Sequence, residues 1–332
     1  MIFLEIVASK FYLREGMKTL LAFFRLIRSV NLLFIVFTQV LFQYAIIRPS
    51  LQLANLTPAL SLEHFLLLMF ASVCIAAGGY IINDYFDLNI DRVNKPDKLV
   101  IEKYIKRRWA IFWHLFLSIV GIGITEYVGV LLGQPYFLGL LNTLCVILLW
   151  VYSTTFKKKL LSGNLIISVL TAWVLLILFW IELERTFSGS LTTFHQAAVS
   201  RIFKFAMLYG GYAFILSLIR EIIKDIEDRV GDLKYGCRTM PIAWGLQTTK
   251  IFILTLLVIL ILSLIILQIY VVVYQWWLSI LYAVIFIIAP LIVLYKKVML
   301  ASSKEDFNSI SQYIKWIMLS GILSMSFILY YA

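Results

Sequence analysis

The chain has 332 residues, of which 62% are hydrophobic and only 14% are charged. Soluble globular proteins carry charge on about a quarter of their residues, so this composition, with a mean hydropathy of +0.94, excludes an ordinary soluble protein. The net charge of +11 does not indicate a nucleic-acid partner, because the basic residues follow the membrane topology predicted from the apolar segments.

Apolar stretches long enough to cross a bilayer recur along the whole chain. A hydrocarbon core of roughly 30 Å requires about 20 residues of helix, and the runs are continuous rather than alternating, which favours helices over strands. We therefore predict an all-α fold, a polytopic membrane helix bundle of nine transmembrane helices that forms a single domain over residues 1–332. The predicted helices are 22–47, 62–83, 110–132, 135–155, 164–182, 202–220, 251–270, 273–295 and 312–331.

The segments outside these helices are predicted to lie at the membrane surface. Residues 1–20 read as an interfacial N-terminal arm, and residues 84–109 and 221–249 as loops of the active site. No cleavable signal peptide is expected, because the first apolar run has no basic region before it and no small-residue cleavage site after it.

Basic residues are concentrated on one side of this topology. The segment before the first helix and the loops after the second, fourth, sixth and eighth helices share that side, and most of the 29 Lys and Arg residues fall there. The opposite side keeps only Arg48, Arg185, Arg201 and Lys204. By the positive-inside rule, we expect a multi-pass protein of the cell (inner) membrane whose active site faces the cytoplasm.

Two aspartate clusters lie at the cytoplasmic ends of the second and sixth predicted helices. Each has aspartates at positions i, i+3 and i+7: Asp84, Asp87 and Asp91 in the first, and Asp225, Asp228 and Asp232 in the second. On a helix each set would form one stripe about 10 Å long. Four helices separate the clusters, and because that number is even, both are predicted on the same side.

One acidic run beside a helix end is usually a solvated surface. Two runs with the same spacing, in two halves of the chain, are harder to explain in that way, because acidic residues are costly near membrane depth. Mg²⁺ binds one or two carboxylates together with water and phosphate oxygens. The six aspartates are therefore predicted to bind Mg²⁺ and a diphosphate, stabilising the diphosphate as a leaving group.

Basic side chains beside the clusters are the expected contacts of the diphosphate. Arg92 and Lys95 follow the first cluster, and Lys224 and Arg238 flank the second. A polyprenyl diphosphate would suit this site, because it joins an ionic head to a hydrocarbon tail. Its allylic C–O bond ionises once the leaving group is neutralised, and an apolar, aromatic-lined chamber would protect the resulting cation from water.

The motifs around these residues resemble those of the UbiA superfamily of intramembrane prenyltransferases over nearly the whole chain. They are Arg25-x-x-Arg28-x-x-Asn31, then Asn83-Asp84-x-x-Asp87-x-x-x-Asp91 with Asn94-Lys95-Pro96-Asp97, then Tyr152-Ser153-Thr154-Thr155-Phe156-Lys157 with Gly163-Asn164, and Lys224-Asp225-Ile226-Glu227-Asp228 with Gly231-Asp232 and Gly236-x-Arg238-Thr239-Met240-Pro241. One departure lies at 98–103, Lys-Leu-Val-Ile-Glu-Lys, where many members continue as Arg-Pro-Ile-Pro-x-Gly.

The resemblance implies transfer of a prenyl group with Mg²⁺ as cofactor. Both aspartate motifs would bind metal and diphosphate, with Asn83, Asp84, Asp87, Asp225 and Asp228 as catalytic residues. It also implies assisting roles for Asn83, Arg92, Tyr152 and Lys157. Arg28 and Asn31 are weaker candidates for the acceptor side.

The acceptor is less well specified than the donor. The second motif looks most like the branch that transfers geranylgeranyl to geranylgeranylglyceryl phosphate, an ether-lipid reaction. Branches with aromatic acceptors, 4-hydroxybenzoate or dihydroxynaphthoate in quinone synthesis, share the same metal motifs and remain an alternative.

A membrane transporter is the alternative of another class, because ionisable residues also line transport pathways. Transport sites usually lie near mid-membrane on broken helices, whereas these clusters lie at helix ends, which favours an enzyme. Cys74, Cys145 and Cys237 lack metal-ligand spacing, so we predict reduced packing residues.

Overall fold

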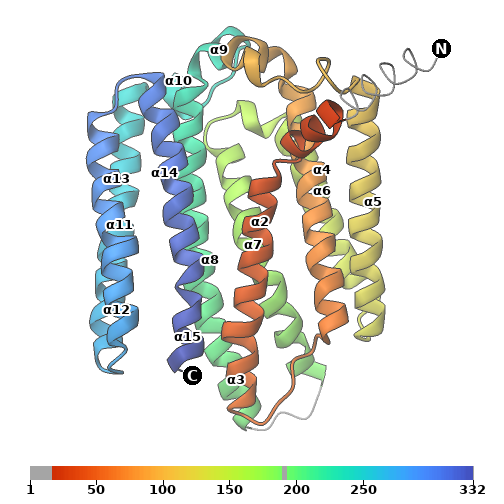
Figure 1. Ribbon diagram of the computed structural model, residues 1–332, viewed down its shortest axis with the longest axis vertical. Coiled ribbons are helices and arrows are strands. Elements are labelled where there is room, and N and C mark those ends of the chain that lie inside the picture. Colours follow the sequence, from red (N-terminus) through yellow and green to blue (C-terminus); the bar gives the residue numbers. More distant parts are fainter. Residues whose placement is uncertain (1–16, 189–192, 332) are drawn as a thin grey trace, which may run out of the picture. The chain divides into compact units, whose positions relative to one another are not determined.

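The computed structural model describes residues 17–188 and 193–331, leaving out the side chains of 185–195. Within this part of the chain, nine helical spans are long and apolar enough to cross a membrane: Ser29–Gln52, Leu62–Asn94, Arg107–Leu131, Phe137–Thr154, Ser162–Glu184, Gln196–Glu227, Leu246–Val272, Trp277–Leu300 and Lys304–Tyr331. Figure 1 shows long helices joined by short connections. The predicted all-α membrane fold with nine spans is confirmed.

Several spans are built from more than one helical segment. In chain order the segments are α2 (Ser29–Leu41), η1 (Phe42–Ile47), α3 (Arg48–Gln52), α4 (Leu62–Asn94), η2 (Pro96–Lys98), α5 (Arg107–Leu131), α6 (Phe137–Thr154), η3 (Phe156–Lys158), α7 (Ser162–Ser188), α8 (Thr193–Glu227), α9 (Arg229–Lys234), α10 (Met240–Ala243), α11 (Leu246–Val272), α12 (Trp277–Ala283), η4 (Val284–Ile288), α13 (Ala289–Leu300), α14 (Lys304–Leu323) and α15 (Met325–Tyr331).

Two of these segments, η1 and η4, are π-helical turns, and each lies just before a proline. Pro49 follows η1 and Pro290 follows η4, both in the first turn of the next α-helix. Proline has no backbone N–H and its ring crowds the carbonyl four residues earlier, so the helix widens locally instead of breaking.

The chain divides into two compact units, and each holds one aspartate cluster. Unit 1 comprises Met1–Ile35 and His64–Thr154, and unit 2 comprises Val36–Glu63 and Thr155–Ala332. The first cluster belongs to unit 1 and the second to unit 2. The single domain expected over 1–332 stays a prediction.

A core in unit 1 fixes the loop that follows α4. It consists of buried small and aliphatic side chains: Ala22, Leu26, Ile81, Leu88, Val100, Ile101, Ile105 and Ala110. The loop also closes on itself, because Glu102 N donates to Ile105 O at 2.8 Å and Tyr104 N donates to Val100 O at 2.9 Å. The segment that departs from the resembled pattern is therefore held by its own apolar side chains.

The core of unit 2 lies among α8, α11, α13 and α14. Most of its buried side chains are Ile and Leu, and several are fully buried, including Ile219, Ile222, Leu257, Leu291 and Ile314. Side by side with α8 lies α7 (Figure 1). The α7–α8 hairpin positions the second aspartate cluster at one end.

The structure corrects the predicted helix ends at both clusters. The first cluster lies within α4, which continues to Asn94, so the loop expected from residue 84 starts later. The stripe predicted for the second cluster is wrong, because α8 ends at Glu227 and Asp228 is the N-cap residue of α9. Aspartate favours such N-cap positions over helix interiors.

The first predicted helix also differs. Residues 17–26 form a separate helix, and a turn at 27–28 precedes α2, with Arg28 at a positive φ of 51°. Most of the interfacial arm expected at 1–20 lies outside the described residues.

A buried lysine of α11 stabilises the end of a neighbouring helix. Lys250 Nζ donates to Met299 O at 2.8 Å and to Ala301 O at 2.9 Å, at the end of α13 where the last carbonyls have no partner within the helix. We expect Lys250→Met to lower the free energy of unfolding by about 1.5–3 kcal/mol, measured by denaturant unfolding in detergent. The exposed Lys296 gives the control, Lys296→Met, and equal losses in both variants would contradict the assignment.

Candidate active site

In unit 1, α4 presents the first cluster on a single helix. Asn83 Nδ2 donates to Asp87 Oδ2 at 2.9 Å, one turn further along the helix, and both residues are buried. Asp84 is half-buried, and its Oδ1 lies 2.7 Å from Nη2 of Arg28. Asp91 lies one turn beyond Asp87 on the same helix. Asp84, Asp87 and Asp91 therefore share one helix, as predicted.

Arg28 reaches Asp84 from the turn before α2. Its positive φ is a conformation that costs a non-glycine residue about 1–2 kcal/mol, and such strain often marks functional positions. The guanidinium also lies 4.9 Å from the ring centroid of Tyr80. Arg28 is thus part of the first cluster in this structure, whereas Asn31 is half-buried near the start of α2.

The predicted diphosphate contacts of unit 1 lie just beyond the cluster. Arg92 forms an ion pair with Glu102 from the closed loop, and Arg107 Nη1 lies 3.8 Å from the other oxygen of the same carboxylate. Lys95 follows the end of α4, and its backbone N donates to Asp91 O at 2.8 Å. Glu102, which the sequence did not single out, thus holds Arg92 beside the first cluster.

Tyr152 and Lys157, two of the predicted site residues, belong to different units. Tyr152 is buried near the end of α6, in unit 1. Lys157 is half-buried in η3, in unit 2.

In unit 2, the first turn of α7 contacts the second cluster. Asn164 Nδ2 donates to Asp225 Oδ2 at 2.8 Å. Asn164 is buried, and Asp225 is half-buried and has Asp232, Glu221 and Lys224 as its charged neighbours. The break after α8 therefore keeps Asp232 near Asp225 although the two residues lie on different helices.

Two backbone contacts connect the remaining motif segments of unit 2. Arg238 N donates to Lys158 O at 2.7 Å, and Cys237 N donates to Asp232 O at 2.9 Å. Gly163 lies against the loop of Lys157, where an added Cβ would lie 2.9 Å from Lys157 Cα. The Lys157 loop, the Gly163-Asn164 pair, the second cluster and the Arg238 segment thus form one continuous site in unit 2.

Carboxylates that were not predicted as site residues hold the cations and helices of this site. Glu221 pairs with Arg220 at 2.8 Å and with Lys224 at 3.5 Å. Glu227 Oε1 accepts a hydrogen bond of 2.8 Å from Asn308 Nδ2 on α14. Lys224, a predicted diphosphate contact, is therefore held by a buried neighbour.

The donor set fits a magnesium diphosphate better than a metal bound by protein alone. Among the described residues, no three His, Cys, Asp or Glu side chains are grouped closely enough to hold a metal ion. Mg²⁺ commonly takes one or two carboxylates, with waters and substrate phosphates completing its shell. In addition, the buried Thr239 Oγ1 beside Arg238 has no protein partner within the described part of the chain, which suits a donor to a phosphate oxygen.

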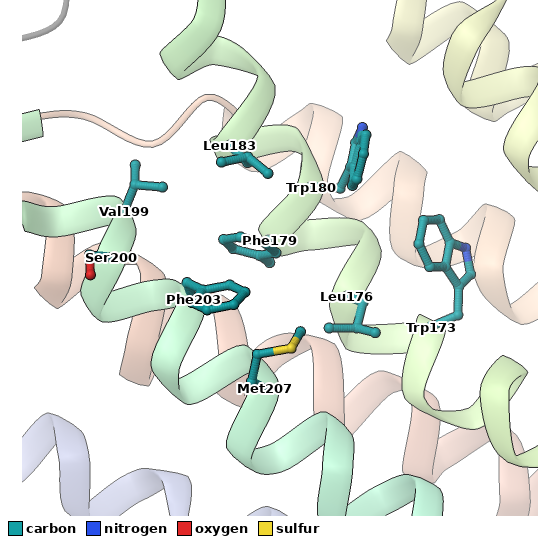
Figure 2. Close-up of a pocket in the computed structure, with 9 residues that line it drawn as sticks. All are labelled: Trp173, Leu176, Phe179, Trp180, Leu183, Val199, Ser200, Phe203 and Met207. Atoms are coloured by element: carbon teal, nitrogen blue, oxygen red, sulfur yellow. The ribbon is translucent and has the colours of Figure 1, made fainter. Parts of the chain in front are cut away.

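An apolar cavity lies between α7 and α8 (Figure 2). It has a volume of about 550 Å³ and is lined by Trp173, Leu176, Phe179, Trp180, Leu183, Val199, Ser200, Phe203 and Met207. Its nearest residue along α8, Met207, is 18 positions before Asp225, or about 27 Å along a helix. Its walls suit hydrocarbon and not a diphosphate.

All three cysteines lie in the described part of the chain, where they are buried and form no disulfide, as predicted. The residues with contacts at the site that the prediction did not include are Glu102, Asn164, Glu221, Glu227 and Thr239. Asn164 and Thr239 lie within the motifs that carry the family resemblance, and this position is the sequence signal that could have identified them. Glu102 gave none, because it lies in the segment that departs from the resembled pattern.

Comparison with known proteins identifies the family. Residues 51–319 match the model of the UbiA prenyltransferase family. The digeranylgeranylglyceryl phosphate synthase of Methanosphaera stadtmanae is 32% identical over 78% of this chain and 86% of its own length. The synthase of the same name from Sulfurisphaera tokodaii is 33% identical over 59% of this chain and 63% of its own length. That of Methanothrix thermoacetophila is 35% identical over 60% of this chain and 65% of its own length.

Solved structures share the fold. A UbiA homologue from Aeropyrum pernix superposes with a TM-score of 0.59 at 18% identity, over 86% of this chain and 96% of that one. A UbiA homologue from Archaeoglobus fulgidus, bound to DMAPP and Mg²⁺, gives 0.53 at 17% identity, over 92% and 99%. A structure described for digeranylgeranylglyceryl phosphate synthase gives 0.56 at 23% identity, over 93% and 99%. The chain belongs to the UbiA prenyltransferase family and is an integral membrane prenyltransferase.

Proposed function

We propose that this enzyme transfers a geranylgeranyl group from geranylgeranyl diphosphate to geranylgeranylglyceryl phosphate, a step of ether-lipid synthesis, with Mg²⁺ as its cofactor. The observation that carries the proposal is the site in unit 2, where Asp225, the Lys157 loop and the Arg238 segment come together. The names of the relatives at 32–35% identity support the acceptor. The ligands of the A. fulgidus homologue support the donor class and the metal.

In this proposal, the aspartates of each cluster would hold Mg²⁺, which would supply positive charge to neutralise a diphosphate. The cationic side chains assigned to phosphate oxygens are Arg92 and Lys95 in unit 1, and Lys157, Lys224 and Arg238 in unit 2. The C1–O bond of the donor breaks and the diphosphate leaves with the electron pair. A hydroxyl oxygen of the acceptor bonds to C1 and loses its proton to water.

Carboxylates beside these groups prepare the site before substrate binds. The buried Glu221 pairs with Lys224, and the exposed Glu102 pairs with Arg92, so both cationic side chains are restrained in position. Restraint of this kind lowers the entropy lost when the diphosphate binds. The proposal places the active site at the cytoplasmic face of the cell (inner) membrane, where the basic residues concentrate.

The test is transfer from geranylgeranyl diphosphate in detergent, with Mg²⁺ present. One sample receives geranylgeranylglyceryl phosphate and a second receives dihydroxynaphthoate. We expect product in the first sample only, and none after EDTA. Product in the second sample alone would move the enzyme to quinone synthesis, and turnover that survives EDTA would contradict the metal's role.

A further inference from the structure

The buried side-chain amide of Asn164, on α7, donates a hydrogen bond to an aspartate of the second cluster. Asn164 is 6% exposed, and its Nδ2 donates to Asp225 Oδ2 at 2.8 Å across the α7–α8 hairpin. This distance is that of a well-formed N–H···O hydrogen bond. The bond therefore selects one orientation of the Asp225 side chain.

The position of Asn164 is itself fixed by its neighbours. Gly163 packs against the backbone of the Lys157 loop, and Ser168 Oγ donates to Asn164 O at 2.6 Å. The Asn164 side chain thus starts from a rigid backbone, and its amide is aimed at one carboxylate oxygen. Because Oδ2 receives this bond, Oδ1 of Asp225 is available for another ligand.

We propose that Asn164 is a positioning residue for the transfer reaction, acting through Asp225 by presenting its Oδ1 to the metal diphosphate. The inference rests on the proposed function and adds a residue to its machinery. The amide is suited to this task because it donates without adding charge. A carboxylate at the same position would repel Asp225, and a cation would compete with the metal.

Removing a hydrogen-bond partner of a metal ligand commonly costs about 10- to 100-fold in metal affinity or activity. Asn164→Leu keeps the branching at Cγ and deletes the donor, so we expect the Mg²⁺ concentration for half-maximal transfer to rise at least about tenfold. The KM for the acceptor should stay within about twofold, because the change acts on the metal diphosphate. Asn164→Gln, which restores an amide donor, should recover part of the loss.

Ser168→Ala is the matched control. Ser168 is fully buried on the same helix and donates to the Asn164 carbonyl, but within the described residues Asp225 accepts its hydrogen bond from Asn164 and not from Ser168. A role of Asn164 in packing alone predicts equal behaviour of Asn164→Leu and Ser168→Ala. A positioning role predicts that only Asn164→Leu raises the Mg²⁺ requirement.

Binding must be measured independently of turnover. Mn²⁺ can replace Mg²⁺ as the probe, and its electron paramagnetic resonance signal reports the bound fraction in the presence of a non-reactive thiolo analogue of geranylgeranyl diphosphate. We expect at least about tenfold weaker Mn²⁺ binding in Asn164→Leu, with wild-type binding in Ser168→Ala. Wild-type binding in Asn164→Leu would overturn the inference, whereas absence of binding and transfer in the unmodified enzyme would overturn the proposed function itself.

Discussion

Replacing Asp84 or Asp228 with alanine is expected to abolish prenyl transfer while leaving the protein folded. Each substitution removes a carboxylate from one of the two clusters that the proposal assigns to metal binding. Loss of one group that stabilises a developing negative charge commonly costs about 100- to 1,000-fold in rate, so we expect each variant to fall below about 1% of the native rate. Product formation measured by mass spectrometry provides the test.

The fold should tolerate both changes, because neither carboxylate belongs to a hydrophobic core. Asp84 is half-buried and pairs with Arg28, and Asp228 lies at the N-cap position of a six-residue helix without a capping hydrogen bond from its side chain. Asp84→Asn, which keeps the shape and removes the charge, separates the loss of charge from a loss of packing. Glu63→Ala changes an exposed acid at the other end of α4 and should be fully active. Near-native turnover in either aspartate variant would refute the assignment of that cluster.

The sequence predicted the spans well because the lipid imposes one requirement on every membrane segment: enough consecutive apolar residues to satisfy the backbone within a helix. It predicted the ends of the helices less well, because residues beyond the membrane surface need not be apolar to remain in a helix. Both α4 and α8 continue past their apolar runs. The break at Asp228 and the turn at Arg28 depend on local backbone preferences that hydropathy does not record.

The sequence indicated candidate aspartates and cations for the site, but not the side chains that contact them. The aspartates repeat at a readable spacing, and the cations stand next to them in the sequence. Asn164 contacts Asp225 from 61 positions away, and Glu102 reaches Arg92 through a loop closed by its own aliphatic residues. Contacts of this kind follow from tertiary packing, so a single sequence gives no spacing from which to predict them.

A side chain at Gly163 is expected to damage the site without touching a charged residue. A Cβ at this position would lie 2.8 Å from Phe156 O and 2.9 Å from Lys157 Cα. Both are backbone atoms, so the Lys157 loop would have to move, and displacements of about 1 Å near a reacting group can cost about 100-fold in rate. We expect Gly163→Ala to lower kcat/KM at least about tenfold, and Gly163→Val to lower it further.

The matched control is Gly211→Ala in the same unit. Gly211 lies within α8 and has no atom within 4 Å of an added Cβ, and alanine favours a helix over glycine by about 1 kcal/mol. Gly211→Ala should therefore keep full activity and unfold at the same or a higher temperature. Equal activity of Gly163→Ala and Gly211→Ala would leave two explanations. Either the Lys157 loop moves without a loss of activity, or the loop does not contact the diphosphate. Lys157→Ala would then decide between these two explanations, because only the first still requires the lysine for transfer.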